Sequence, residues 1–93
     1  MNMNELEKAR LEIDAIDLEM AHLYERRLQA VQRVVQYKIE NQMPILDSNR
    51  EQLILKRNEM WVRPQYRESY KKFQTYVMEE SKRFQNQERK MQK

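Results

Sequence analysis

The chain of 93 residues contains no glycine and no cysteine, and it has only two prolines. The lack of cysteine excludes a disulfide framework and thiol chemistry. The lack of glycine, together with a charged fraction of 35%, favours long helices over a β-sheet with tight turns. The length indicates a single domain, residues 1–93, which we expect to be all-α.

Long apolar runs are absent as well. No stretch approaches the ~20 residues of a membrane span. The opening MNMNELEKAR lacks the apolar core of a signal peptide, so we expect a cytoplasmic protein with no membrane partner. The single His22 has no cysteine and no second histidine to share a metal ion, so no metal site is expected.

The net charge of +3 comes from lysines and arginines that are interspersed with acidic residues. A nucleic-acid surface needs charge of one sign clustered on one face, and this pattern does not provide it. We therefore expect no nucleic-acid partner. A helical dimerisation or nucleic-acid-binding module that uses the basic tail remains an alternative without enzymatic activity.

Helix-breaking residues are sparse. Pro44 and Pro64 are the strong breakers, and they predict three helices at about 4–42, 47–60 and 65–90. Asp47 or Ser48 can cap the second helix, and Ser48 with Glu51 has the spacing of a capping box. Met60, Trp61 and Val62 are expected to pack in the loop after this helix. The third helix carries apolar residues at helical spacing, which predict a packing face: Tyr66, Tyr70, Phe73, Val77 and Phe84.

The first predicted helix carries a heptad seam in which steps of three and four residues alternate. Its apolar or small members are Leu6, Ala9, Ile13, Ile16, Met20, Leu23, Ala30 and Val34. Arg27 lies seven residues after Met20 and therefore falls on the seam. A cation in an apolar seam is costly unless an anion meets it. Arg27 therefore predicts either a bound anion or an ion pair with a glutamate of a neighbouring helix.

The first predicted helix is also too long for its own chain to cover. A helix of about 39 residues extends to ~58 Å, whereas a compact chain of this length has a radius of gyration of ~12 Å. An uncovered heptad stripe would be a large exposed apolar patch. We therefore expect an intertwined homodimer in which the two long helices pair antiparallel about a two-fold axis.

Several polar residues share faces with apolar ones. Lys38 lies eleven residues after Arg27, which places both cations on one helix face about 16 Å apart. Ser81 and Gln85 are four residues apart on the third helix and also share a face. These side chains could surround a small polyanion. Lys38 could instead extend to solvent from the helix end, and Ser81 and Gln85 could lie on the surface.

Asp47 and Glu51 form another pair at a spacing of four, although both could be capping residues only. Arg10 lies about 25 Å from Arg27 along the same helix, so it could reach only the site of a partner chain. The sequence shows no nucleophile beside a base and no glycine-rich phosphate loop. Any enzyme built on this pattern works by binding and electrostatics.

These residues and their order resemble the all-helical class of chorismate mutases. The matching segments are RLEIDAID (10–17), LYERR (23–27), Lys38, PILDSNRE (44–51) and MEESKRFQ (78–85), which together span most of the chain. The resemblance implies three helices per chain in an intertwined dimer. It also implies the Claisen rearrangement of chorismate to prephenate, a step of the shikimate pathway toward phenylalanine and tyrosine, without a cofactor.

The resemblance implies specific roles at the substrate's carboxylates and ether oxygen. Arg27 and Arg10 of the partner subunit would bind the two carboxylates, to which bidentate arginine geometry is suited. Lys38 would face one carboxylate and the ether oxygen, and Gln85 would donate a second hydrogen bond to that oxygen. Lys38, Gln85 and Arg27 are therefore the expected catalytic residues.

The remaining residues carried over by the resemblance would bind other parts of the substrate. Ser81 would assist at a carboxylate, and Glu51 with the backbone around Asp47 would hold the ring hydroxyl. Arg50 would support the pocket from its edge. An isochorismate pyruvate-lyase on the same fold is the nearest alternative. The short connections leave no room for a regulatory domain, so regulation would need a partner enzyme of the same pathway.

Overall fold

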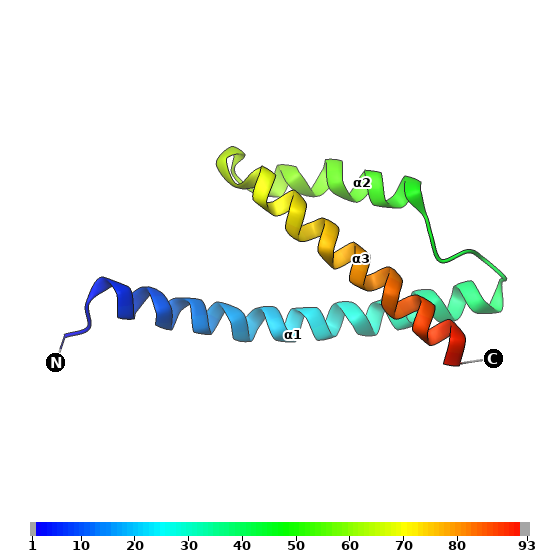
Figure 1. The fold of residues 1–93 in the computed structure, drawn as a ribbon, viewed down its shortest axis with the longest axis horizontal. Coiled ribbons are helices and arrows are strands. Elements are labelled where there is room, and N and C mark those ends of the chain that lie inside the picture. Colours follow the sequence, from blue (N-terminus) through cyan, green and yellow to red (C-terminus); the bar gives the residue numbers. More distant parts are fainter. Residues whose placement is uncertain (1, 92–93) are drawn as a thin grey trace. The chain divides into compact units, whose positions relative to one another are not determined.

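The computed structural model describes residues 2–91, which form three α-helices and two short 3-10 turns (Figure 1). The helices are α1 (Glu5–Glu40), α2 (Ser48–Asn58) and α3 (Arg67–Met91), and the turns η1 (Glu59–Trp61) and η2 (Pro64–Tyr66) join α2 to α3. No strand occurs within residues 2–91. The prediction of an all-α chain with three helices, one of them very long, is confirmed.

Helix α1 contains 36 residues, which corresponds to a length of about 54 Å. The contacts within the chain define two units, residues 1–30 and residues 31–93, and α1 contributes to both. In the part of the chain that the structure describes, no helix is both long enough and apolar enough to cross a membrane.

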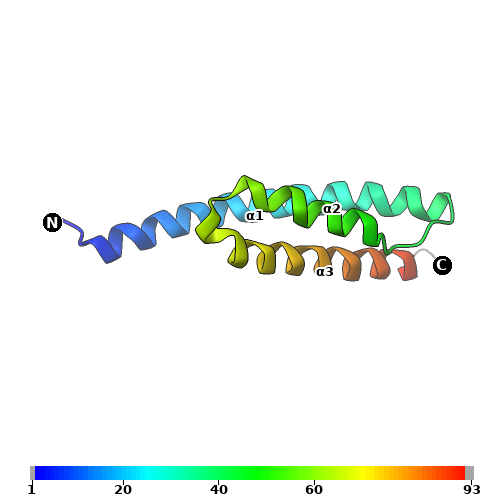
Figure 2. The same ribbon diagram turned by 90° about the horizontal axis from the view of Figure 1, so that it is seen from above.

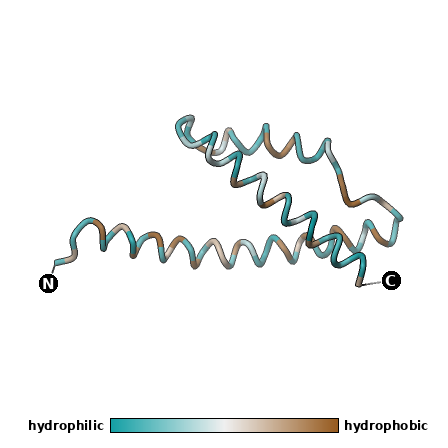
Figure 3. The backbone as a smooth tube through the Cα atoms, viewed as in Figure 1, coloured by the Kyte–Doolittle hydropathy of each residue, from teal (hydrophilic) through white to brown (hydrophobic). Residues whose placement is uncertain are grey.

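In the first unit, the apolar seam of α1 is exposed. The side chains of Leu6, Ile13, Ile16, Met20 and Leu23 are between 44% and 56% exposed. Apolar positions recur along the helix, visible as repeated brown segments in Figure 3. The sequence predicts that the rest of the chain leaves this stripe uncovered. His22 is exposed.

Helix α1 ends in a Schellman motif that does not use glycine. The backbone N–H of Met43 donates to the carbonyl of Lys38 at 2.8 Å, and that of Gln42 donates to Ile39 at 3.2 Å. Gln42 has a φ of 54°, the left-handed conformation that this motif requires and that glycine usually supplies. Because the chain has no glycine, a glutamine occupies the position at a cost of about 1–2 kcal/mol.

In the second unit, α2 and α3 form a helical hairpin that is closed at the η1 and η2 turns (Figures 1 and 2). Asp47 is the N-cap of α2, and its carboxylate accepts from the backbone N–H of Arg50 at 3.0 Å. The predicted Ser48–Glu51 capping box is wrong. Ser48 is the first helical residue, and Glu51 forms an ion pair with Lys82 instead.

Polar contacts fix the closed end of the hairpin. Asn58 and Gln74 are buried, with the amide nitrogen of Asn58 3.5 Å from the amide oxygen of Gln74. The Tyr70 hydroxyl donates to the same oxygen at 2.9 Å. Trp61 was expected to pack in this loop, but its side chain is 67% exposed and contacts the guanidinium of Arg57 at 5.0 Å.

The buried face of α3 differs from the predicted apolar face. The buried residues are Gln74, Met78, Ser81 and Gln85, at helical steps of four, three and four. Of the predicted face, Tyr66 and Phe73 are exposed, whereas Tyr70, Val77 and Phe84 are half-buried. Within this chain, α3 therefore turns a largely polar stripe inward. The alternative that Ser81 and Gln85 lie on the surface is excluded.

The buried apolar residues of the second unit are few: Val31, Val35, Ile45, Ile54 and Met78. Val31 and Val35 lie on α1, one turn apart, and Ile54 lies on α2. Ile45 comes from the connection between α1 and α2, so this loop contributes to the core. The backbone of residues 43–47 is thereby held against the end of α1, where the candidate site forms.

Candidate functional site

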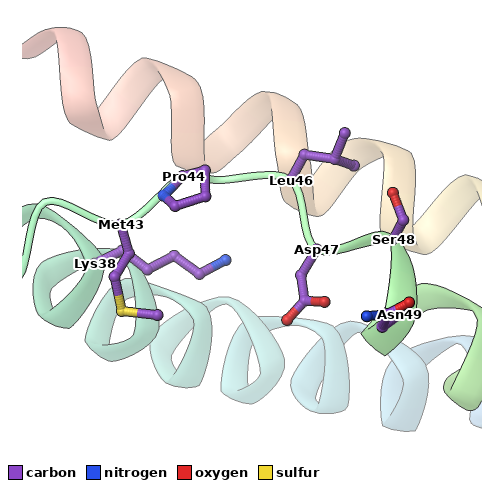
Figure 4. Close-up of a pocket in the computed structure, with 7 residues that line it drawn as sticks. All are labelled: Lys38, Met43, Pro44, Leu46, Asp47, Ser48 and Asn49. Carbon is purple, nitrogen blue, oxygen red and sulfur yellow. The ribbon is translucent and has the colours of Figure 1, made fainter.

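A pocket of about 340 Å³ opens between the end of α1 and the start of α2 (Figure 4). It is lined by Lys38, Met43, Pro44, Leu46, Asp47, Ser48 and Asn49. The Lys38 side chain extends across it from the side of Met43 toward the side of Asp47. The pocket thus combines one cation with a short apolar wall and the polar N-terminus of a helix.

Lys38 lies in the last turn of α1 and is half-buried. Its ammonium donates to the backbone carbonyl of Ile45 at 2.8 Å and to the amide oxygen of Gln85 at 3.3 Å. A lysine ammonium carries three N–H donors, so one remains for a ligand in addition to these two acceptors. The loop carbonyl and the amide together hold the ammonium in place, and Lys38 does not extend to solvent as the alternative held.

Gln85 and Ser81 lie next to Lys38 on the buried face of α3. Their exposed fractions are 7% and 8%. The amide nitrogen of Gln85 donates to the hydroxyl of Ser81 at 3.2 Å. The amide has a second N–H, which is available to an acceptor placed near Lys38. Lys38, Gln85 and Ser81 therefore form one hydrogen-bonded row.

Glu51 lies one turn into α2 and is half-buried. Its carboxylate is 3.2 Å from the ammonium of Lys82, which is also 3.1 Å from Glu79. The hydrogen bonds to Glu79 and Glu51 raise the pKa of the Lys82 ammonium. Lys82 therefore remains charged across the neutral range and partly neutralises both carboxylates.

Asp47 both lines the pocket and caps α2 with its carboxylate. Since that carboxylate is engaged in the cap, the backbone around Asp47 is held at the pocket's edge. Arg50 is exposed, and its backbone N–H is the donor to this cap. The structure thus brings Lys38 and Asp47 around one pocket, and hydrogen bonds link Lys38 to Gln85 and Gln85 to Ser81.

Arg10 and Arg27 lie on the part of α1 that belongs to the first unit. Arg10 is exposed and Arg27 is half-buried. The hydrogen bonds and ion pairs described above join residues of the second unit only. The placement of both arginines at the site therefore stays a prediction.

Two contributions to the site were not predicted from the sequence. The carbonyl of Ile45 accepts from Lys38, and a backbone acceptor leaves no trace in a side-chain pattern. Lys82 joins Glu51 to α3, yet in the sequence it is one of many lysines. The only available signal was its place directly after Ser81 in the segment MEESKRFQ.

This arrangement can bind an anion and place two donors on one oxygen atom. Within the described residues, no group of histidine, cysteine, aspartate and glutamate side chains is arranged to hold a metal ion. Every buried side-chain nitrogen or oxygen in that part of the chain has a hydrogen-bond partner. The polar groups around Lys38 therefore form a satisfied, pre-positioned network.

Comparison with known proteins supports the same family. Neither the curated proteins nor the solved structures provided a match. A sequence model of chorismate mutase type II matches residues 9–86, which covers most of the chain, including the segments that carry Lys38, Glu51, Ser81 and Gln85. The chain therefore belongs to the chorismate mutase type II family.

Proposed function

We propose that the protein is a chorismate mutase that rearranges chorismate to prephenate. The observation that carries this proposal is the contact of Lys38, which lines a pocket of about 340 Å³, with the buried amide of Gln85. An ammonium and an amide side by side can both donate to one ligand oxygen. The family match supports assigning that oxygen to chorismate's ether.

In the reaction, the ether C–O bond breaks while a C–C bond forms between the enolpyruvyl methylene carbon and the ring. Negative charge grows on the ether oxygen as its bond lengthens. The third N–H of Lys38 and the second N–H of Gln85 would strengthen their hydrogen bonds to this oxygen as the charge develops. Such donors stabilise the transition state more than the ground state, which accelerates the reaction.

The carboxylates of the substrate need cations that hold the flexible enolpyruvyl arm over the ring. In our proposal, Arg27 binds one carboxylate and Arg10 of the partner subunit binds the other. Ser81 assists at a carboxylate, a role that fits its position 3.2 Å from the amide nitrogen of Gln85. Bidentate arginine–carboxylate pairs would fix both the position and the orientation of the substrate.

The ring hydroxyl would be held by Glu51 and by the backbone near Asp47. Asp47 and Glu51 are four residues apart around the start of α2, so they share a face. Arg50 would support the edge of the pocket. Residues 1–93 would act as one domain in the shikimate pathway toward phenylalanine and tyrosine, and an enzyme of that pathway could regulate it as a partner.

The shared site requires a homodimer, which we propose to be intertwined with antiparallel α1 helices. The exposed apolar side chains along α1 support this assembly, because a second chain would remove them from water. An antiparallel pair would also bring Arg10 of one chain toward the Arg27–Lys38 stretch of the other.

The function is tested by incubating the purified protein separately with chorismate and with isochorismate. We expect chorismate to disappear and prephenate to form without added cofactor. Pyruvate from isochorismate, without prephenate from chorismate, would assign the lyase activity instead. Turnover of neither substrate would contradict both assignments.

The Lys38 and Gln85 roles are tested by Lys38→Ala and Gln85→Ala. Each should lower kcat at least about a hundredfold, the usual effect of removing a donor to a developing oxyanion. Lys71→Ala is the control, since Lys71 pairs with Glu59 at 2.8 Å outside this hydrogen-bonded row. Steady-state kinetics with circular dichroism separates loss of chemistry from loss of fold. Near-full activity in either variant would refute the ether-oxygen assignment.

A further inference from the structure

Lys82 forms an ion pair with Glu51, a predicted substrate-binding carboxylate. Its ammonium lies 3.2 Å from a carboxylate oxygen of Glu51 on α2 and 3.1 Å from one of Glu79 on α3. The side chains of Lys82 and Glu51 are only 25% and 26% exposed. Partial burial weakens screening by salt, so this pair is stronger than a fully exposed one.

The position of this pair relative to the pocket follows from helix geometry. Asp47 and Ser48 line the pocket, and Glu51 lies four and three residues beyond them on the same face of α2. On α3, Lys82 directly follows Ser81, which is hydrogen-bonded to Gln85 and through it connected to Lys38. The Glu51–Lys82 pair therefore bridges α2 and α3 beside the site.

The pair solves an electrostatic problem of the proposed substrate. A carboxylate beside a site for a dicarboxylate repels it, since like charges in a partly buried site interact unfavourably. The Lys82 ammonium offsets the charge of Glu51 while leaving it an ionised acceptor for a hydroxyl. Glu79 gives Lys82 a second acceptor, so Glu51 can turn toward a ligand without leaving the ammonium unpaired.

We propose that Lys82 is a positioning residue that orients Glu51 and offsets its charge, and that it thereby lowers the KM for a hydroxylated dicarboxylate. This inference rests on the proposed function. Lys82 acts through Glu51 and does not touch the reacting atoms. Its loss should therefore weaken substrate binding and leave the chemical step nearly unchanged.

The test compares steady-state kinetics with chorismate for the wild-type protein, Lys82→Gln, Lys82→Arg, Glu51→Gln and the double variant. Lys82→Gln should raise KM by about three- to tenfold and leave kcat within about twofold, as expected for a partly buried ion pair. Lys82→Arg keeps the charge and should restore most of the wild-type KM. In the Glu51→Gln background, Lys82→Gln should cause no further increase in KM.

Lys71→Gln is the matched control, because it also breaks a lysine–glutamate pair between α3 and a neighbouring element. A KM for Lys82→Gln no higher than that of Lys71→Gln would overturn the proposal. An equal effect of Lys82→Gln with and without Glu51 would also overturn it, since Lys82 would then act on the substrate directly. Absence of wild-type turnover would refute the proposed function itself, and the Lys82 role with it, before any variant is compared.

Discussion

At the scale of single residues, polar side chains on apolar faces identified the site. Ser81 and Gln85 occupy the buried face of α3, where apolar side chains would ordinarily pack. Their burial costs little free energy because each has a hydrogen-bond partner. The amide oxygen of Gln85 accepts from Lys38, and its amide nitrogen donates to Ser81. A buried polar row beside a pocket, in which every side chain has a hydrogen-bond partner while Lys38 and Gln85 each keep an unused N–H, is more typical of a binding site than of a core.

The identity of residue 85 predicts the pH dependence of catalysis. Gln85 is a neutral amide, so it donates a hydrogen bond without first having to take up a proton. We therefore expect kcat to be nearly flat between about pH 6 and 8. The measurement is a pH profile of chorismate turnover in buffers of constant ionic strength.

Gln85→Glu provides the comparison. A glutamate at this position would donate to the ether oxygen of the proposed substrate only when it is protonated, so the variant's kcat should fall as the pH rises. A steep change in the wild-type rate between pH 6 and 8 would contradict the assignment of Gln85. The same profile in the wild type and the variant would contradict it too.

At the scale of secondary-structure elements, the end of α1 positions the site. Its Schellman motif brings the chain back over the last turn. There the backbone N–H of Met43 donates to the carbonyl of Lys38, and the carbonyl of Ile45 accepts a hydrogen bond from the Lys38 ammonium. The backbone and the side chain of one residue thus hold the loop that forms the pocket wall. Arg89 near the end of α3 adds a hydrogen bond to the carbonyl of Met43. The geometry of the site therefore depends on how a helix ends.

The left-handed conformation of Gln42 predicts a stabilising substitution. Gln42→Gly should raise the free energy of unfolding by about 0.5–1 kcal/mol, because the relief of a cost of roughly 1–2 kcal/mol exceeds the entropy that glycine loses on folding. Thermal and urea denaturation would measure the change.

Gln52→Gly is the control for this prediction, since Gln52 lies on the exposed side of α2 with helical backbone. The same substitution there should destabilise the protein by about 1 kcal/mol. If Gln42→Gly destabilised the protein as much as Gln52→Gly does, the stabilising role of glycine at the end of α1 would be refuted.

At the scale of the whole molecule, the proposed site is shared between two chains. If Arg10 acts across a dimer interface, two inactive variants can complement each other. Mixing Arg10→Ala with Lys38→Ala should restore about a quarter of wild-type activity, because about half of the dimers are then mixed and each has one intact site. Activity after chain exchange, with the dimer verified by sedimentation, is the measurement.

Lys38→Ala mixed with Gln85→Ala is the control for complementation. These two residues contact each other within one chain, so both serve the same site. In a mixed dimer, one site therefore lacks Lys38 and the other lacks Gln85. No activity should return in this mixture. Recovery here, or none with Arg10→Ala despite verified exchange, would contradict the shared site.

Local patterns in the sequence were sufficient for the elements and the family. The steps of three and four, two prolines and the lack of glycine predicted three helices with a very long first one, because helix periodicity and chain breaks are local properties. The order of the motifs around Lys38, Glu51, Ser81 and Gln85 indicated the chorismate mutase family, which the family match confirms.

Only the tertiary structure decided which face of α3 is buried, which acceptors surround Lys38 and which partner Glu51 takes. The aromatic face of α3 looked like its packing face, yet Gln74, Ser81 and Gln85 are the residues turned inward. The Glu51 carboxylate could either cap α2 or form an ion pair. It forms an ion pair with Lys82 because α3 lies within reach of it. Burial, loop carbonyls and ion pairs between helices depend on neighbours that are distant in sequence, so periodicity along a single helix cannot specify them.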